Sequence, residues 1–420
     1  MTWSLHHVFG VLPHRIMAEL SRRHGPLMFL RLGEVPTVVV SSAEMAEVVM
    51  KSKDLMFASR PRGVTLDVIG YGSGIGIIFA PYSDRWHQAR KVCTMELLSA
   101  KQVKRMEGIR SEEVSNLLSS ITTSIGTTIN LTEKLSALMN DVIARAVFGG
   151  KCAQQGEYLR ELEKVTALVG GFSLVDLFPS SRLVRLLSSG ERRMRRSYGR
   201  IQCIISNIIE KRKEMRAAVS SNDEEDLLDV LLRLHKEDSL PYPLTLEAIG
   251  VIIFDLFAGG TKTSGITLEW AMSELLKNPE NMRKVQLEVR QVVGGQQSVI
   301  NNNDLHDLHY MRMVIKEVLR YWDAPEAFKP ERFKESNIDH KGTHFEFTPF
   351  GAGRRQCPGM LFGTSTVEIA LANLLHHFDW VFPDGPNPGS LDMSEKFGIN
   401  VRRKFDLELR ATPYVLSKVA

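Results

Sequence analysis

Apolar side chains recur at helical spacing through most of the chain after residue 84. Intervals of three and four residues place such positions on one face of a helix. The segments that show this pattern, and that we predict to be helical, are Arg85–Met106, Leu131–Phe148, Gly156–Leu168, Glu191–Met215, Glu225–Lys236, Asp304–Arg320 and Leu361–His377. Before residue 84, two short apolar runs, Leu27–Leu32 and Thr37–Val40, flank Gly33 and Glu34 and predict a β-hairpin.

The longest helical pattern runs from Thr245 to Lys277 and is apolar on most faces. Such a helix would be roughly 50 Å long, and its apolar surface predicts a central position in the fold. A stretch rich in proline and glycine, Ala324–Gly359, is predicted to be an irregular loop. The sequence contains no internal repeat and no linker. We therefore expect a single domain over residues 1–420, mainly α with a small β part.

Composition and charge narrow the class of protein. Apolar residues make up 43% of the 420 residues and charged residues 24%, which excludes disordered and fibrous chains. The net charge of +4 is too small to indicate binding to nucleic acid. The longest apolar stretch, Ala248–Gly260, contains Asp255 and is too short to span a bilayer, and no secretory signal opens the chain. As written, the chain is expected to be soluble.

One of the four cysteines lies in an unusual setting. Cys93, Cys152, Cys203 and Cys357 are widely scattered, which fits a reducing compartment and gives no short metal-ligand spacing. Cys357 lies in the Gly-rich, doubly basic loop Phe350–Gly359, directly before a helix. Nearby cations and the N–H groups of a helix N-terminus lower the pKa of a thiol, so this pattern predicts a thiolate. The alternative is a loop cysteine without a role.

The long central pattern contains the second unusual segment, Ala258–Ser264. Its adjacent glycines, Gly259 and Gly260, each cost roughly 1 kcal/mol relative to alanine inside a helix. A flat ligand packed against the backbone would offset this cost, and close packing of two helices is the alternative. The Thr263 hydroxyl is expected to donate to the Gly259 carbonyl and to distort the helix locally.

Pairs of residues at helical spacing are further candidates. Trp86 and Arg90 form a WxxxR pattern, and Glu317 and Arg320 form ExxR, each on one helical face. Taken alone, each pair is more typical of a solvated surface. Three other patterns favour structural interpretations: the loop Gly72–Gly76, the pair His306 and His309, which lacks a third zinc ligand nearby, and the basic run Arg192–Arg196, a solvated face or a membrane contact.

Together these patterns resemble the cytochrome P-450 haem-thiolate monooxygenases. The loop fits the family's haem-binding motif FxxGxRxCxG at Phe350, Gly353, Arg355, Cys357 and Gly359. The resemblance implies that Cys357 is the axial ligand of the iron in haem b (iron protoporphyrin IX), with Phe350 packed beside its sulfur. It also implies the P-450 fold, which has a long central helix.

The resemblance assigns roles to the other pairs as well. Arg355 would pair with a haem propionate, and Trp86 and Arg90 would reach a propionate from their own helix. The segment Pro330–Phe333 resembles the PERF motif of the family. The members of a buried ion-paired triad that supports the haem loop would be Glu317, Arg320 and Arg332.

The segment Ala258–Ser264 is similar to the family's oxygen-binding groove, formed here by Gly259 and Gly260. Thr263 would guide protons to bound dioxygen. The family has an acidic residue directly before this threonine, whereas this chain has Lys262. A lysine cannot act as the same carboxylate relay, so we expect altered proton delivery and poor coupling of oxygen use to product.

The resemblance covers nearly the whole chain and is strongest to the plant microsomal branch that oxidises terpenoids and other specialised metabolites. Two segments look like substrate-contacting regions of that branch, Gly171–Leu187 and Phe397–Tyr414. The chain starts after the membrane anchor and the Pro-rich hinge of that branch. Arg320 is followed at once by Tyr321-Trp322-Asp323, where the family has several tens of residues, so a segment is expected to be missing here.

The resemblance therefore implies a monooxygenase that inserts one oxygen atom of dioxygen into an apolar small molecule. Electrons would come from NADPH through the NADPH–cytochrome reductase, a flavoprotein. We expect a monomer that binds no nucleic acid. By resemblance it would lie at the cytosolic face of the endoplasmic reticulum membrane, and without an anchor in this chain it could instead be soluble in the cytoplasm.

The rival interpretation is a non-catalytic truncated remnant that retains a partial fold and weak haem binding. The missing segment after Arg320 and the presence of Lys262 favour it. The 12 steps from Arg320 to Arg332 can span at most roughly 40 Å, so the triad can still close. Loss of the β layer that this segment supplies in the family is expected to expose apolar surface on the remaining strands.

Overall fold

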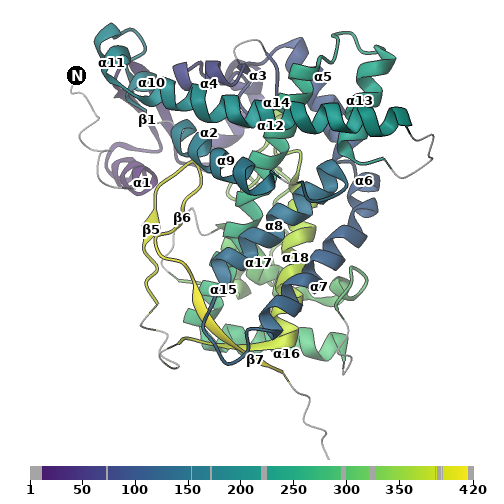
Figure 1. Cartoon of the computed structure of the whole chain (residues 1–420). Helices are drawn as coiled ribbons and strands as arrows, with labels where there is room; N and C mark the ends of the chain where they lie inside the picture. Colours follow the sequence, from purple (N-terminus) through teal and green to yellow (C-terminus); the bar gives the residue numbers. More distant parts are fainter. Residues whose placement is uncertain are drawn as a thin grey trace, which may run out of the picture.

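The computed structural model describes residues 12–414 except 72–73, 153, 171–172, 219–224, 295–298, 321–326, 384, 386–388 and 390. Helices dominate, as expected (Figure 1). The α-helices of the first half are α1 (Pro13–His24), α2 (Ala43–Glu47), α3 (Asp54–Phe57), α4 (Val64–Val68), α5 (Asp84–Val92), α6 (Ala100–Arg105), α7 (Glu107–Thr122), α8 (Leu131–Phe148), α9 (Gln155–Val169), α10 (Leu174–Leu177), α11 (Arg182–Leu187) and α12 (Gly190–Ala218).

The second half contributes the helices of the core. The α-helices there are α13 (Leu227–Glu237), α14 (Leu246–Gly260), α15 (Lys262–Lys277), α16 (Pro279–Val293), α17 (His309–Arg320) and α18 (Met360–His377). Short π or 3-10 turns complete the helical part: η2 (Val48–Ser52), η4 (Cys93–Leu97), η5 (Asp304–Asp307), η6 (Pro330–Phe333) and η7 (Gly353–Arg355).

The β part is small, as predicted. Strands β1 (Leu27–Leu32) and β2 (Val35–Val40) form an antiparallel hairpin in which Leu27 pairs with Val40. Its turn needs Gly33, which has a φ of +65° and approaches Leu177 so closely that a Cβ would lie 2.4 Å from the Leu177 carbonyl oxygen. The other strands form a three-stranded and a two-stranded antiparallel sheet: β3 (Ile129–Asn130), β7 (Glu408–Pro413) and β4 (Phe378–Val381), and β5 (Glu395–Lys396) with β6 (Arg402–Arg403).

Helices α14 and α15 occupy the centre of the molecule. The Thr245 hydroxyl caps α14 by accepting from the Ala248 N–H (3.2 Å), and all of residues 249–257 are buried. Helix α15 packs against α8, α17 and α18, while α12 crosses one end of the bundle and β7 lies at the other (Figure 1). By length and composition alone, the span Leu246–Lys277 could cross a membrane, but 67% of its most apolar window is buried inside the protein. It is therefore the core helix of the fold.

The predicted long central helix is present as the span Leu246–Lys277, with a local distortion that separates α14 from α15. The predictions of single helices over Arg85–Met106 and Asp304–Arg320 were wrong, and the second segment begins as η5 and continues as α17 only from His309. The central pattern divides at Thr261, where the Thr261 hydroxyl donates to the Phe257 carbonyl (2.8 Å). Threonine hydroxyls that compete for i−4 carbonyls bend helices, and two glycines precede this position. The pattern Arg85–Met106 divides into α5, η4 and α6, with Leu98 and Ser99 between the last two.

The hairpin carries exposed apolar side chains. Leu27, Phe29 and Val38 are 52%, 65% and 55% exposed. That the missing segment would cover such apolar surface stays a prediction. The predicted junction at Tyr321-Trp322-Asp323 lies outside the described residues.

Candidate active site

One large cavity, of about 830 Å³, lies between α14–α15 and the loop that precedes α18. One wall carries Cys357 and the other carries Gly259, Gly260 and Thr263. Aliphatic and aromatic side chains form much of the remaining wall: Ile77, Ile78, Leu98, Ile143, Val147, Leu256, Ile315, Leu319, Phe347 and Val367. The cavity therefore combines a single thiol with mainly apolar surroundings, which suits an apolar ligand of substantial size.

Tight turns in the loop present Cys357 to the cavity. The Cys357 N–H donates to the Phe350 carbonyl (2.8 Å), which closes the loop on itself. Gly353 has a φ of +62°, and a Cβ there would lie 2.0 Å from the Met50 carbonyl oxygen, so only glycine fits. Cys357, Phe350 and Gly359 line the cavity, whereas Gly353 packs on η2 behind it. The thiol is exposed to the cavity.

The predicted thiolate does not follow from the surroundings of Cys357 in this fold. Burial raises the pKa of the Cys357 thiol, and this effect outweighs the Gly359 N–H and the Arg90 guanidinium, which lower it. The local sequence pattern counts the stabilising groups without the cost of desolvation, so the thiolate stays a prediction for the iron-bound state. A metal ion bound to the sulfur would remove the proton outright.

Three arginines gather on the same side of the cavity, and Arg60 was not predicted. Arg355 donates to the carbonyls of Ala58 (2.6 Å) and Ala80 (2.6 Å), and Arg90 donates to the Gln356 carbonyl. Burial, with Arg60 and Arg90 nearby, lowers the pKa of Arg355 to about 10.

Among the described residues, none of the three arginines has a carboxylate ion-pair partner, and their side chains donate to backbone carbonyls instead. The cluster therefore forms a site for an anionic group, and more than one carboxylate would fit its charge.

Trp86 supports this cluster rather than lining the cavity. The residue is 1% exposed, and its indole N–H donates to the Ile77 carbonyl (3.1 Å). The Arg355 guanidinium lies 4.0 Å from the indole ring centroid, and that of Arg90 lies 5.7 Å from it. The Ser83 hydroxyl fixes the start of α5 by accepting from the Trp86 N–H (3.2 Å). The WxxxR pair thus contributes Arg90 to the cluster, and its Trp86 ring packs against Arg355.

The opposite wall shows the hydrogen bond that the sequence predicted. The Thr263 hydroxyl donates to the Gly259 carbonyl at 2.6 Å, and both residues line the cavity. Lys262 points elsewhere: its Nζ lies 3.6 Å from Glu163 of α9, and Arg402 contacts the same carboxylate at 3.4 Å. The structure therefore brings Gly259, Gly260 and Thr263 to the site and leaves Lys262 outside the cavity wall.

The predicted triad is present. Glu317 is 3% exposed and contacts Arg332 (2.7 Å) and Arg320 (3.3 Å), and it also accepts the Lys329 N–H (3.1 Å). The prediction that these residues can still meet across the short connection is confirmed.

Other sequence candidates have mixed outcomes. Of the two segments expected to contact substrate, the C-terminal one brings Ile399, Asn400 and Val401 to the cavity, while the described residues 173–187 form α10 and α11 away from it. Residues 171–172 lie outside the described part. Within that part, no group of three or more His, Cys, Asp or Glu side chains could hold a metal ion. His306 and His309 therefore have no third ligand there.

Two important residues carried weak signals in the sequence. Arg60 lies beside Pro61 in a stretch without periodicity, so no pattern marked it. Asp255 interrupts the longest apolar run, and a charge inside an apolar helix was the available sign of a special position.

The residues present fit an iron porphyrin. Cys357 offers a single sulfur ligand, the arginine cluster matches two propionates, and Gly259 leaves open space on the facing wall, where the nearest atom to an added Cβ is 4.0 Å away. These are the requirements of a flat, dianionic group held by one thiolate.

The comparisons with known proteins agree with this chemistry. The family model described as Cytochrome P450 matches residues 2–321 and 320–404, so the match divides at the position where a missing segment was predicted. Desmethyl-deoxy-podophyllotoxin synthase of Sinopodophyllum hexandrum is 42% identical, over 97% of this chain and 89% of that protein. The 5-epiaristolochene 1,3-dihydroxylase of Nicotiana tabacum is 39% identical over 99% of this chain and 91% of that protein.

Both alignments, of 455 and 462 positions, are longer than this chain, so each relative has residues without a counterpart here. Among solved structures, a zebra fish cytochrome P450 with progesterone superposes with a TM-score of 0.81 at 23% identity. That match covers 96% of this chain and 100% of the other, and it establishes the likeness of fold.

Proposed function

This chain belongs to the cytochrome P450 family, and on that premise we propose that it inserts one oxygen atom of dioxygen into an apolar small molecule with electrons from NADPH. It has the P450 fold, and its relatives are named oxygenases and hydroxylases, so it is classed as a haem-dependent monooxygenase. The observation that carries the proposal is the single cavity that holds Cys357 on one wall and Gly259 and Thr263 on the other.

Different residues of the chain would bind the iron, neutralise the propionates and exclude water from the cofactor. Haem b, when bound, supplies the iron chemistry that activates dioxygen, and a thiolate ligand favours O–O cleavage. Cys357 would hold the iron, and Arg60, Arg90 and Arg355 would neutralise the propionates. The apolar walls exclude water from the reaction and leave few competing proton donors.

Thr263 is the proposed proton-handling residue on the substrate side. Its hydroxyl lines the cavity and already donates to the Gly259 carbonyl, so its oxygen remains free to accept a hydrogen bond from water or ligand. Lys262, outside the cavity wall, is proposed to lack the relay role that an acidic residue has in the family.

The proposed substrates are terpenoid-like plant specialised metabolites. Relatives at 38–39% identity are named for 5-epiaristolochene, premnaspirodiene and germacrene A. The apolar lining of the 830 Å³ cavity supports this class because burial of hydrocarbon surface would supply most of the affinity. A flavin-containing NADPH–cytochrome reductase is the proposed electron donor, and the proposed state of the chain is a monomer.

The decisive experiment is the absorption spectrum of the haem-loaded, reduced protein with carbon monoxide, followed by turnover of candidate terpenes with NADPH and the reductase. We expect the red-shifted Soret band of thiolate-ligated haem and oxygenated product. Cys357→Ala should abolish both, whereas Cys203→Ser, at an exposed position of α12, should leave both unchanged. Survival of the thiolate band in Cys357→Ala would refute the ligand assignment.

A non-catalytic remnant is the second candidate, and the divided family match at residues 320–321 favours it. In that case the chain would bind haem weakly and below one equivalent, with no product from any terpene tested. Stoichiometric haem with efficient turnover would eliminate this candidate.

We also propose that α11 contacts a membrane surface, as expected at the cytosolic face of the endoplasmic reticulum. Leu183, Leu186 and Leu187 are 65%, 75% and 74% exposed on this short helix, which also carries Arg182 and Arg185. Apolar side chains flanked by arginines suit the interface of an anionic bilayer.

Co-sedimentation with vesicles of phosphatidylcholine and phosphatidylserine tests this contact. The double change Leu186→Asp and Leu187→Asp should weaken binding several-fold. Leu287→Asp, at a 56% exposed position on α16 toward the other end of the molecule, is the matched control (Figure 1). Equal binding of the wild type and both variants would remove α11 from the contact.

A further inference from the structure

A buried carboxylate on the central helix holds the wall of the cavity in place. Asp255 of α14 is 2% exposed and accepts hydrogen bonds from the Tyr71 hydroxyl, from the Ile77 N–H (2.6 Å) and from the Ile78 N–H (3.4 Å). Residues 74–80, here called the strap, therefore cross α14 at Asp255. The side chains of Ile77 and Ile78 line the 830 Å³ cavity.

The contact between the strap and Asp255 is close and specific. Gly76 has a φ of +97°, and a Cβ there would lie 2.9 Å from an Asp255 oxygen and 2.6 Å from the Tyr71 ring. No ion pair joins Asp255 to a cation among the described residues; the titratable groups that interact with it are Tyr71, Tyr158, Tyr198 and Cys93.

Burial raises the pKa of each of those four groups, so all four are neutral near pH 7. The carboxylate is thus satisfied by Tyr71 and the strap amides, and releasing the strap would leave it unsatisfied.

The other edge of the strap is bound to the arginine cluster. The Ile77 carbonyl accepts from Trp86 (3.1 Å) and from Arg355 (3.4 Å), and the Ile78 carbonyl accepts from Arg60 (3.2 Å). The Ile77 residue is therefore clamped through its N–H by the central helix and through its carbonyl by residues of the proposed propionate site. While the hydrogen bonds on both sides of Ile77 are formed, the strap backbone can adopt few other conformations.

A second cavity, of about 180 Å³, gives the strap a place to move. Gly74, Ile75 and Gly76 border it, together with Ala248 and Ile252 of α14. Residues 248, 252, 255 and 259 share one helical face, because they are spaced by three or four residues. This face borders the small cavity at Ile252 and the large one at Asp255 and Gly259. The strap is the partition between the two cavities.

We propose that Asp255 is a positioning residue that sets the largest substrate the cavity accepts, by holding Tyr71, Ile77 and Ile78 and so keeping the strap as a partition. The proposal deepens the proposed function and rests on it, since the large cavity is taken as the substrate site. With Asp255 in place, a long apolar ligand meets Ile77 and Ile78. With the carboxylate removed, the strap can move toward the second cavity. The ligand can then extend into the volume beside Gly74–Gly76.

Two measurements on the full chain test this inference. Hydrogen–deuterium exchange, with and without haem, reports the strap amides directly, and the variants are Asp255→Asn and Tyr71→Phe. The matched control is Asp176→Asn, because Asp176 likewise accepts a backbone N–H (3.1 Å) and a hydroxyl (2.6 Å), both from Thr65, but does not line the cavity. We expect at least tenfold faster exchange over residues 74–80 in Asp255→Asn, a smaller rise in Tyr71→Phe, and none there in the control.

The second measurement is the Soret shift on titration of the haem-loaded protein with N-alkylimidazoles of increasing chain length. In the wild type, affinity should rise by roughly fourfold per methylene and then level off where the chain reaches the strap. In Asp255→Asn the levelling should occur at longer chains, and in Asp176→Asn it should not move.

Unchanged exchange over residues 74–80 in Asp255→Asn would overturn the positioning role. Faster exchange with an unchanged length limit would overturn the role in substrate size. If the wild type shows no imidazole-induced Soret shift at all, the proposed function fails at the haem site, while the exchange data still decide whether Asp255 holds the strap.

Discussion

Gly259 and Gly260 are adjacent on α14, yet they meet different neighbours. A Cβ at Gly260 would lie 2.4 Å from Cδ1 and 3.0 Å from Cγ1 of Ile143 on α8, whereas a Cβ at Gly259 would meet only Ile78 Cδ1, at 4.0 Å. Both interpretations of this pair therefore hold, one for each residue: Gly260 allows two helices to pack closely, and Gly259 leaves space in the cavity.

The two glycines should differ sharply on substitution. Gly260→Ala is expected to lower the free energy of unfolding by about 1–3 kcal/mol, since Ile143 must move. Gly259→Ala should have little effect or raise it slightly, because alanine has the better helix propensity. Urea unfolding measures both. Adding Ile143→Val, which removes the clashing Cδ1, should restore part of the loss in Gly260→Ala, and failure to do so would show that the strain lies elsewhere.

Lys262 provides the second prediction at this scale. Lys262→Asp should raise the product formed per NADPH consumed, because a carboxylate would stand directly before Thr263. The change places a new carboxylate near that of Glu163, so it is best tested with Glu163→Gln, which removes the like charge. Lys262→Gln removes the cation without adding a carboxylate and is the control. An increase of the ratio in Lys262→Gln as large as in Lys262→Asp would contradict the relay argument. Stability should change by less than about 1 kcal/mol, since the pair is partly exposed.

Asp255 also gives a pH dependence of stability. Burial raises its pKa from 3.8 to about 6 in the folded chain. Between these values the folded state binds more protons than the unfolded state, so the free energy of unfolding falls as pH rises from about 4 to about 6, by up to about 3 kcal/mol. Asp255→Asn lacks this titration. The stability of the wild type relative to Asp255→Asn should therefore decline across that window and stay level above it, and a constant difference would contradict the raised pKa.

At the scale of elements, an ion-paired triad joins α17 to the η6 turn. Glu317 is buried at 3% exposure and is shared by Arg320, Arg332 and the Lys329 N–H. This arrangement fixes the start of the long loop that ends at Cys357. The loop is mostly irregular, so its shape depends on such anchors rather than on its own backbone ladder.

Breaking the triad should therefore affect stability and haem loading together. Glu317→Gln leaves Arg320 and Arg332 without their carboxylate and is expected to cost about 3 kcal/mol of unfolding free energy, with reduced haem content. Glu19→Gln, which removes an exposed ion pair with Arg23 on α1, should cost less than about 1 kcal/mol and leave haem content unchanged. Chemical unfolding and the haem-to-protein ratio check both variants. Normal haem loading in Glu317→Gln would separate the triad from the haem loop.

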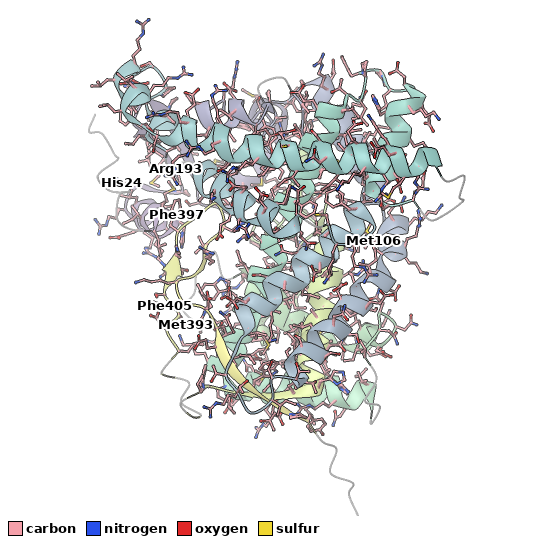
Figure 2. The ribbon with its side chains drawn as sticks, viewed as in Figure 1. His24, Met106, Arg193, Met393, Phe397 and Phe405 are labelled. Carbon is pink, nitrogen blue, oxygen red and sulfur yellow. The ribbon has the colours of Figure 1, made fainter. Side chains whose placement is uncertain are left out.

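At the scale of the whole molecule, the connection after Arg320 is the place where the match to the family model divides. Their alignments run to 455 and 462 positions against a chain of 420 residues, and the family match divides at residues 320–321. The described fold has only a two-stranded sheet at β1–β2, with Leu27 and Phe29 exposed. Two more exposed aromatic side chains lie near the C-terminal strands: Phe397 is 41% exposed and Phe405 is 53% exposed. Figure 2 shows both on the same side of the molecule.

Restoring a relative's segment between Arg320 and Tyr321 should raise haem occupancy and melting temperature together. The physical reason is the covering of exposed apolar surface, which contributes roughly 25 cal/mol per Å² buried. A flexible Gly/Ser insert of equal length is the control and should raise neither. If the chain already binds one equivalent of haem tightly and the relative's segment adds nothing, the shorter connection is a tolerated deletion.

Local sequence was sufficient wherever the chemistry depends on neighbours within a few residues. The Thr263 hydrogen bond to Gly259, the pairing of Glu317 with Arg320 and the tight loop at Cys357 follow from fixed i to i+4 and turn geometry. Helix extents were accurate where periodicity was uninterrupted, as in Leu131–Phe148, which is α8 to the residue. The family resemblance rested on these same short motifs.

Tertiary structure decided everything that depends on burial and on distant partners. Cys357 has a raised pKa because packing desolvates the thiol, which no local motif encodes. Lys262 lies outside the cavity wall, and its ammonium group meets Glu163, about 100 positions earlier in the chain. Asp255 and Arg60 acquire their roles only when the strap folds against α14 and the arginine cluster. Electrostatic free energies follow distance and solvent exposure in the folded chain, and neither quantity can be read from sequence order.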